Sequence, residues 1–195
     1  MAMEILIACE YSGIVRDAFT RKGHNVISCD LLPTESPGSH HIRDVLEFVH
    51  ERKFDLVIGF PPCTFLSKAQ MFMYKTVPGR KQKTDEAVCF FSDLYKSAAS
   101  VALENPPGYL TKAFRPPDQI IQPWHFGNSH MKQICLWLKN VPPLIATCYS
   151  PGRRPVSNHT NSRMSQTERG KIRSRFFPEV AEAMANQWTA KYILR

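Results

Sequence analysis

Short apolar segments alternate with segments of helical periodicity over the first two thirds of the chain, and this alternation limits the possible folds. "MEILIACE" (residues 3–10) and "FDLVIGF" (residues 54–60) are apolar without alternation, as strands covered on both faces are. Parallel strands need a long crossover connection, which is usually a helix. The sequence therefore predicts an α/β fold with a Rossmann-like, doubly wound, mostly parallel sheet that carries helices on both faces.

The remaining elements are predicted from the period of their apolar residues and from the residues at their ends. Further strands are expected over residues 24–30, 101–107 and 134–138, and helices over residues 13–23, 42–53, 85–100 (beginning near Thr84) and from near Pro178 onward. Residues 31–41 and 64–84 are expected to be irregular. Because 195 residues suffice for one sizeable core but are few for two, we expect a single domain over residues 1–195.

Composition narrows the class of protein. No stretch approaches the roughly 18 apolar residues of a membrane span, and the apolar run near the N-terminus is too short for a signal peptide. We therefore expect a cytoplasmic protein with no membrane partner. The six cysteines are widely spaced and include no C-x-x-C pair, so neither a metal site nor a disulfide framework is expected.

Positive charge is concentrated in one part of the chain. The net charge is +8, and residues 139–175 contain eight Lys or Arg against one acid, Glu168. A single-signed surplus of this kind suits a polyanion, because phosphates attract lysine and arginine regardless of base sequence. We expect a short, irregular basic subregion over residues 139–175, in which Arg153, Arg154 and Arg173 contact substrate phosphates. A solvated basic loop is the alternative.

Polar residues stand where the predicted strands end, and ligands of open α/β sheets bind at that edge. The first strand is followed by "CEYSG" (residues 9–13), the second ends at Asp30, and the fourth ends at Glu104 and Asn105. An acid after the second strand is where nucleoside cofactors have their ribose hydroxyls bound. The first turn lacks the G-x-G-x-x-G motif that binds dinucleotide phosphates, so NAD is not the expected cofactor. S-adenosylmethionine (SAM), which has no phosphate, fits better.

A thiol and a carboxyl group at neighbouring strand ends suggest one particular chemistry. "DLVIGFPPCTFLS" places Cys63 after two rigid prolines at a strand end. A thiolate that adds to C6 of a pyrimidine, with an acid that protonates N3, turns C5 into a nucleophile able to accept a methyl group. Cys63 would supply the thiolate and Glu104 the proton, and burial would keep Glu104 protonated. Asn105 is expected to fix the glutamate or the base.

These motifs together resemble the DNA cytosine-5 methyltransferases over most of the chain. "GFPPCTFLS" is similar to that family's Pro-Cys loop, "ALENPPGYL" to its Glu-Asn motif, and "RDVLEF" to the segment that meets the adenine. The resemblance implies the fold of SAM-dependent methyltransferases, methylation of cytosine C5 in DNA, and a final helix beside the cofactor turn. It implies catalytic roles for Pro62, Cys63, Glu104 and Asn105, and cofactor contacts for Glu10, Tyr11, Ser12, Gly13, Asp30, Leu31, Asp44, Val45 and Pro61.

The chain departs from the family pattern in three places. Only Gly13 represents the glycines of the first motif. The family's Gln-x-Arg-x-Arg appears as "SHMKQ", in which Lys132 is the nearest cation to a substrate. The large target-recognition domain is replaced by the basic residues 139–175, which are too few to read a base sequence in a groove. Recognition by a partner subunit, and an origin in a bacterium or phage, are what a compact member of the family implies.

Three other functions remain open from the sequence. The same pyrimidine C5 chemistry suits a free deoxynucleotide, which needs no recognition domain. A catalytically inactive relative would only bind nucleic acid or another protein. "NPPGY" (residues 105–109) approaches the motif of amino-methyltransferases, but Gly108 stands at the position of their stacking aromatic residue.

Overall fold

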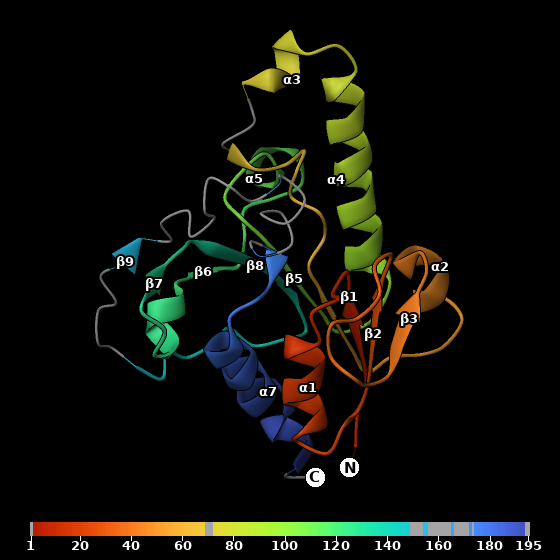
Figure 1. Cartoon of the computed structure of the whole chain (residues 1–195), viewed down its shortest axis with the longest axis vertical. Helices are drawn as coiled ribbons and strands as arrows, with labels where there is room; N and C mark the ends of the chain where they lie inside the picture. Colours follow the sequence, from red (N-terminus) through yellow and green to blue (C-terminus); the bar gives the residue numbers. More distant parts are fainter. Residues whose placement is uncertain are drawn as a thin grey trace.

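A seven-stranded sheet forms the centre of the molecule. The computed structural model describes residues 2–68, 72–148, 154–155, 165, 172 and 174–193. The strands of the sheet are β1 (Glu4–Ala8), β2 (Asn25–Asp30), β3 (His40–Ile42), β4 (Leu56–Gly59), β5 (Val101–Asn105), β6 (Gln119–Ile121) and β8 (Ile134–Lys139). Their spatial order is β3-β2-β1-β4-β5-β8-β6 (Figure 1). Two short strands, β7 (His130–Met131) and β9 (Arg154–Pro155), pair separately.

The sheet is parallel except at one strand. β1 pairs in parallel with β2 and β4, β2 with β3, and β4 with β5, whereas β8 runs antiparallel between β5 and β6. The prediction of a mostly parallel sheet is therefore confirmed. The carboxyl ends of β1, β2, β4 and β5 meet at one edge, and this edge carries the residues singled out in the sequence.

Helices cover both faces of the sheet. The helical elements are α1 (Ile14–Thr20), α2 (Val45–Val49), α3 (Met73–Thr76), α4 (Arg80–Lys96), α5 (Leu110–Ala113), the 3-10 helix η2 (Pro123–Phe126) and α7 (Pro178–Ile193). Ile5 and Ile7 of β1 pack with α1 and α7, while Leu6 and Ala8 pack with α2 and α4. Burial on both faces explains the unbroken apolar run of β1 and confirms the doubly wound architecture. No helix in the described part of the chain is long and apolar enough to cross a membrane.

Three boundaries differ from the prediction. β3 occupies the end of a predicted loop, because its backbone pairs with β2 although its sequence is polar. α2 is shorter than the predicted helix over residues 42–53. Its start is fixed by the Asp44 carboxylate, which accepts the Leu46 N–H at 2.7 Å. α4 begins at Arg80 rather than near Thr84, after Gly79 with φ of 72°. The sequence did not predict β6, β7, β9, α3, α5 or η2.

Candidate functional site

Cys63 lies at the surface on a tight turn beyond β4. Pro61 is buried, while Pro62 and Cys63 are exposed. The N–H groups of Leu66 and Ser67 both donate to the Cys63 carbonyl oxygen at 3.0 Å, which closes the turn behind the thiol. A buried proline on one side and two backbone hydrogen bonds on the other therefore hold the Cys63 backbone. The rigid, solvent-reaching mount expected for a reactive thiol is present.

The Cys63 turn is bonded to the segment that follows β5. Asn105 Nδ2 donates to the Pro61 carbonyl oxygen at 2.8 Å. Further along, the Tyr109 N–H donates to the carbonyl oxygen of Leu66 at 2.8 Å, and residues 68 and 107 share a further backbone hydrogen bond at 3.0 Å. A Cβ atom on Gly108 would lie 2.0 Å from that same Leu66 oxygen, so only glycine fits there. The structure thus brings together the two motifs that the sequence predicted to cooperate.

Glu104 lies near the end of β5 and is half-buried as a whole. Its Oε1 is buried and has no hydrogen-bond partner among the described residues. Burial raises the pKa of Glu104, and the positive charge of Lys132 opposes this rise only in part. The Lys132 Nζ lies 5.6 Å from the centre of the Phe177 ring. Burial thus favours the protonated form of Glu104, and the charge of Lys132 favours the ionised form.

The variant Glu104→Gln is expected to be more stable than the natural protein at neutral pH. Because the folded pKa is raised, the acid's contribution to stability is fully present below its unfolded pKa of about 4.3 and declines as the pH rises through the folded pKa. The amide does not ionise and escapes this loss. Urea unfolding at about pH 4 and about pH 8, with Glu86→Gln on the exposed side of α4 as baseline, measures the difference. Equal stability differences at both pH values would contradict the burial effect.

The sequence did not identify the residues of α4 that hold the Cys63 turn. The Arg80 guanidinium carbon lies 4.4 Å from the centre of the Phe65 ring, and its Nη2 donates to the Thr64 carbonyl oxygen at 2.6 Å. One helical turn later, the Thr84 hydroxyl donates to the Phe65 carbonyl oxygen at 3.2 Å. The spacing of Arg80 and Thr84 on one helix face was the available signal. It was missed because the helix was expected to begin near Thr84.

The turn after β1 is organised by Glu10. Its buried carboxylate accepts the Val15 N–H at 2.7 Å, the Arg16 N–H at 3.3 Å and the Ser12 hydroxyl at 3.0 Å. Burial raises the pKa of Glu10, while these hydrogen bonds from α1 oppose the rise. Gly13, at φ of 77°, supplies the left-handed residue before α1. Glu10 therefore caps α1, and its contact with a cofactor stays a prediction.

An acid and an exposed apolar side chain stand together after β2. Asp30 is half-buried and its Oδ1 accepts the Leu32 N–H at 2.9 Å. Burial raises the pKa of Asp30. Leu31 beside it is 73% exposed. Val45 is buried, and exposed Asp44 precedes it at the start of α2. A carboxylate that accepts hydrogen bonds thus stands beside an exposed apolar side chain.

Two arginines, Arg16 and Arg175, hold the loop that follows β2 at this edge of the sheet. Arg16 is 1% exposed, and its guanidinium donates to the Thr34 hydroxyl at 3.2 Å and to the Ser36 carbonyl oxygen at 2.9 Å. Arg175 forms a two-pronged ion pair with Glu35 at 2.9 and 3.0 Å. These contacts fix the loop that follows Leu31 and were not predicted from the sequence.

The residues before α7 also contact the turn after β1 and the residue that follows β4. The Tyr11 and Ser174 hydroxyl oxygens are 2.9 Å apart, and the Phe176 ring centre lies 4.8 Å from that of Phe60. α7 itself packs on α1. The expected return of the final helix to the cofactor turn is therefore seen in the fold.

The predicted phosphate contacts fall largely outside the described residues. Arg153 and Arg173 are not described, and only the backbone of Arg154 is described, as part of β9. Their contact with a substrate, like that of Lys132, stays a prediction. Within the described part of the chain, no group of three or more His, Cys, Asp or Glu side chains could hold a metal ion.

Comparisons with known proteins support the assignment of the fold and do not assign a function. No protein-family model and no curated protein matches the chain. Among solved structures, the methyltransferase EhMeth of Entamoeba histolytica is 12% identical with a TM-score of 0.50, over 86% of this chain and 62% of that protein. The bifunctional kinase-methyltransferase WbdD is 14% identical with a TM-score of 0.43, over 77% and 37%. The chain thus spans less than two thirds of either protein and shares with EhMeth a Rossmann-like fold.

Proposed function

We propose that this chain is a SAM-dependent methyltransferase that methylates C5 of cytosine in DNA through a covalent bond between Cys63 and C6. The observation that carries the proposal is the bonded junction of the Cys63 turn with the strand end that bears Glu104 and Asn105. Cys63 supplies an exposed thiol on one side of this junction, and Glu104 on the other side supplies an acid whose pKa burial raises. These are the two groups that pyrimidine C5 chemistry needs.

The residues of this chain perform the proton and thiol steps. The Cys63 thiolate adds to C6 while Glu104 gives its proton to N3, so that C5 gains electron density. SAM, when bound, supplies a methyl group on a sulfonium centre. Once the methyl group is on C5, a base removes the C5 proton, the Cys63–C6 bond breaks to return the thiolate, and N3 returns its proton to Glu104. Asn105 holds the Pro61 carbonyl and so keeps the two strand ends in register.

The residues beside β2 fit the cofactor proposed for this site. Asp30 would accept hydrogen bonds from the ribose hydroxyls through Oδ2, because Oδ1 is engaged by the Leu32 N–H. Exposed Leu31 would lie against the adenine. Asp44 would accept from the adenine amino group while it caps α2 through Oδ1. The Glu10 cap leaves no phosphate cradle in the first turn, which agrees with a cofactor that has no phosphate.

The substrate is tested with 5-fluorocytosine, whose C5 fluorine prevents the final proton loss and traps the adduct. Duplex DNA that contains this base and free 5-fluorodeoxycytidylate are each incubated with the protein and SAM, and the adduct mass is measured. An adduct with the DNA supports the proposal. An adduct with the nucleotide alone would move the same chemistry to a monomeric substrate. Adducts with neither would contradict the thiol mechanism and leave a binding protein.

Asp30→Ala is expected to weaken SAM binding by about tenfold or more, because a charged hydrogen-bond acceptor is lost from the ribose. Isothermal calorimetry measures the dissociation constant. Asp93→Ala on α4, which removes an exposed acid far along the chain from β2, is the matched control and should bind as the natural protein does. Equal affinities for both variants would remove Asp30 from the cofactor site.

A further inference from the structure

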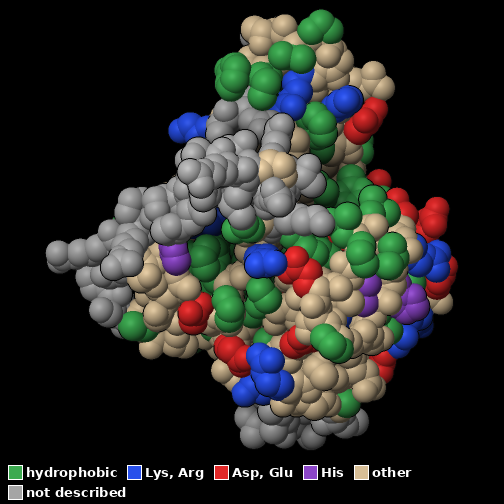
Figure 2. All heavy atoms as spheres, in the orientation of Figure 1, with side chains coloured by type: hydrophobic (Ala, Val, Ile, Leu, Met, Phe, Trp, Pro, Cys, Tyr) green, Lys and Arg blue, Asp and Glu red, His purple; other side chains and the backbone are tan. Residues whose placement is uncertain are grey.

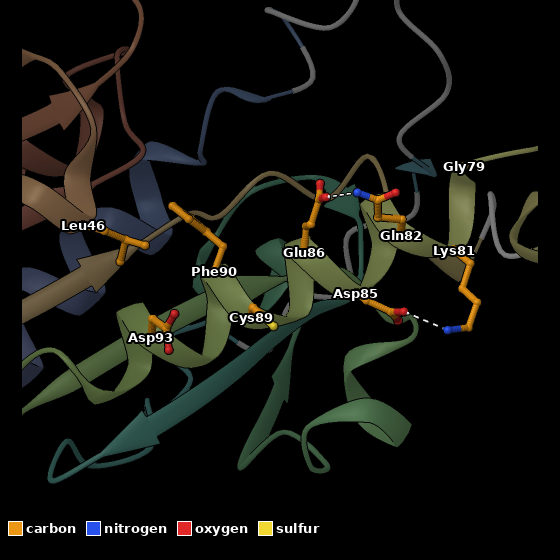
Figure 3. A pocket seen from close by; sticks show the side chains of 9 residues that line it. All are labelled: Leu46, Gly79, Lys81, Gln82, Asp85, Glu86, Cys89, Phe90 and Asp93. Carbon is orange, nitrogen blue, oxygen red and sulfur yellow. Dashed lines mark hydrogen bonds and ion pairs between the residues drawn. The ribbon is translucent and has the colours of Figure 1, made fainter.

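The helix layer on one face of the sheet is incomplete beside α4. α4 has 17 residues, whereas its neighbour α2 has five. In Figure 1, α4 rises past the sheet with no helix parallel to it on the side of α2. A groove of about 830 Å³ lies there and is lined by residues of α4 together with Leu46 of α2 (Figure 3). A gap of this kind is where a further helix of the layer would pack.

The floor of the groove is apolar. Leu46 and Phe90 are both half-buried and pack against the core beneath, but their outer surfaces line the groove. Cys89, which is exposed, lies next to them on the same side of α4 (Figure 3). Apolar surface that is left in contact with water on a helix face favours association with a complementary apolar face.

The rim of the groove is acidic in a protein whose net charge is +8. Asp85, Glu86 and Asp93 line it, and a second hollow of about 560 Å³ beyond Leu46 adds Glu47 and Lys96. Lys81 is the cation of the first hollow and is bound to Asp85 at 3.1 Å. In Figure 2, acidic and hydrophobic side chains lie side by side around the lower part of α4. The four acids of the two hollows outnumber the two lysines, Lys81 and Lys96, and this local excess favours a basic partner.

We propose that this groove is a docking surface for a basic amphipathic helix of a partner protein. Apolar side chains spaced three and four residues apart would cover Leu46 and Phe90, and flanking Lys or Arg would meet Glu86 and Asp93. The stretch of α4 from Gly79 to Asp93 is about 21 Å long, which suits a partner helix of about 14 residues. The proposal does not rest on methyl transfer, because the groove contains none of the proposed catalytic residues.

A designed peptide tests the groove directly. The probe is a fluorescein-labelled helical peptide of about 14 residues with Leu at one face and Lys elsewhere, and two controls are its scrambled sequence and a version with Glu in place of Lys. Fluorescence anisotropy is expected to show binding of the Lys peptide alone. The double variant Glu86→Lys with Asp93→Lys should weaken it about tenfold or more. Glu182→Lys, a charge reversal on α7 at the opposite face, should leave it unchanged.

Cys89 provides a second readout that distinguishes the groove from the Cys63 turn. Alkylation by iodoacetamide, followed by mass spectrometry, reports both exposed thiols in one sample. The bound peptide is expected to slow alkylation of Cys89 and to leave that of Cys63 unchanged. Binding that protects Cys63 instead, that survives the double variant, or that is equal for the scrambled peptide would overturn the proposal. Circular dichroism of the double variant confirms that it is folded.

Discussion

Cys63→Ser is expected to abolish the 5-fluorocytosine adduct and to lower methyl transfer by about 10⁴-fold or more, because serine at neutral pH supplies almost no anionic nucleophile. The substitution changes one atom at an exposed position, so the fold should be unaffected. Mass spectrometry of the trapped complex and a single-turnover assay with labelled SAM measure the two effects.

Cys89→Ser is the matched control for this prediction. Cys89 is also exposed, and it lies on α4 within the acidic groove rather than on the turn after β4. Its replacement should leave adduct formation unchanged. If Cys63→Ser still forms the adduct, or if Cys89→Ser loses it, the assignment of the nucleophile is wrong.

Gly108→Ala is expected to separate the two loops of the candidate active site. The new methyl group would lie 2.0 Å from the Leu66 carbonyl oxygen and 3.0 Å from the Ser67 Cα, and both are backbone atoms that no side-chain rotation can move. The backbone must shift, which breaks the hydrogen bond from the Tyr109 N–H to Leu66. We expect the free energy of unfolding to fall by about 2–3 kcal/mol and the rate of adduct formation to fall with it.

Gly127→Ala is the control that distinguishes a general loss of stability from a disruption of the candidate active site. Gly127 has φ of 93° and no heavy atom within 4 Å of its added Cβ, so alanine there costs only backbone strain of about 1–2 kcal/mol. Urea unfolding should show both variants destabilised, while the adduct rate, measured where both remain folded, should fall only for Gly108→Ala. Natural stability and an unchanged adduct rate for Gly108→Ala would contradict the close approach of the loops.

The sequence predicted the parts of the fold that are encoded locally. A strand buried on both faces is a continuous apolar run, so β1, β4 and β5 could be recognised, and the residues after them were placed at one edge by topology alone. The bonded junction of the Cys63 turn with the end of β5 follows from that reasoning, whereas the cooperation of Cys63 with Glu104 stays a prediction. β3 could not be predicted, because its polar sequence forms a strand only through pairing with β2.

Long-range contacts account for what the sequence could not predict. Arg16 looks like an ordinary solvent-exposed helix residue in the sequence, yet the loop after β2 folds over it and buries it. From the sequence, Gly108 was interpreted only as the absence of an aromatic residue. In the structure, the Leu66 carbonyl oxygen lies so close to Gly108 that no side chain fits there. The acidic groove depends on the short length of α2, which was not predicted.

The packing of α7 on α1, with Arg175 bound to Glu35, has a consequence for the order of folding. A ribosome releases β1 and α1 long before α7, so the apolar side of α1 stays uncovered during most of synthesis. Contacts between elements so distant in sequence also slow folding, because a long loop must close first. The newly made chain would therefore acquire its proposed cofactor edge late.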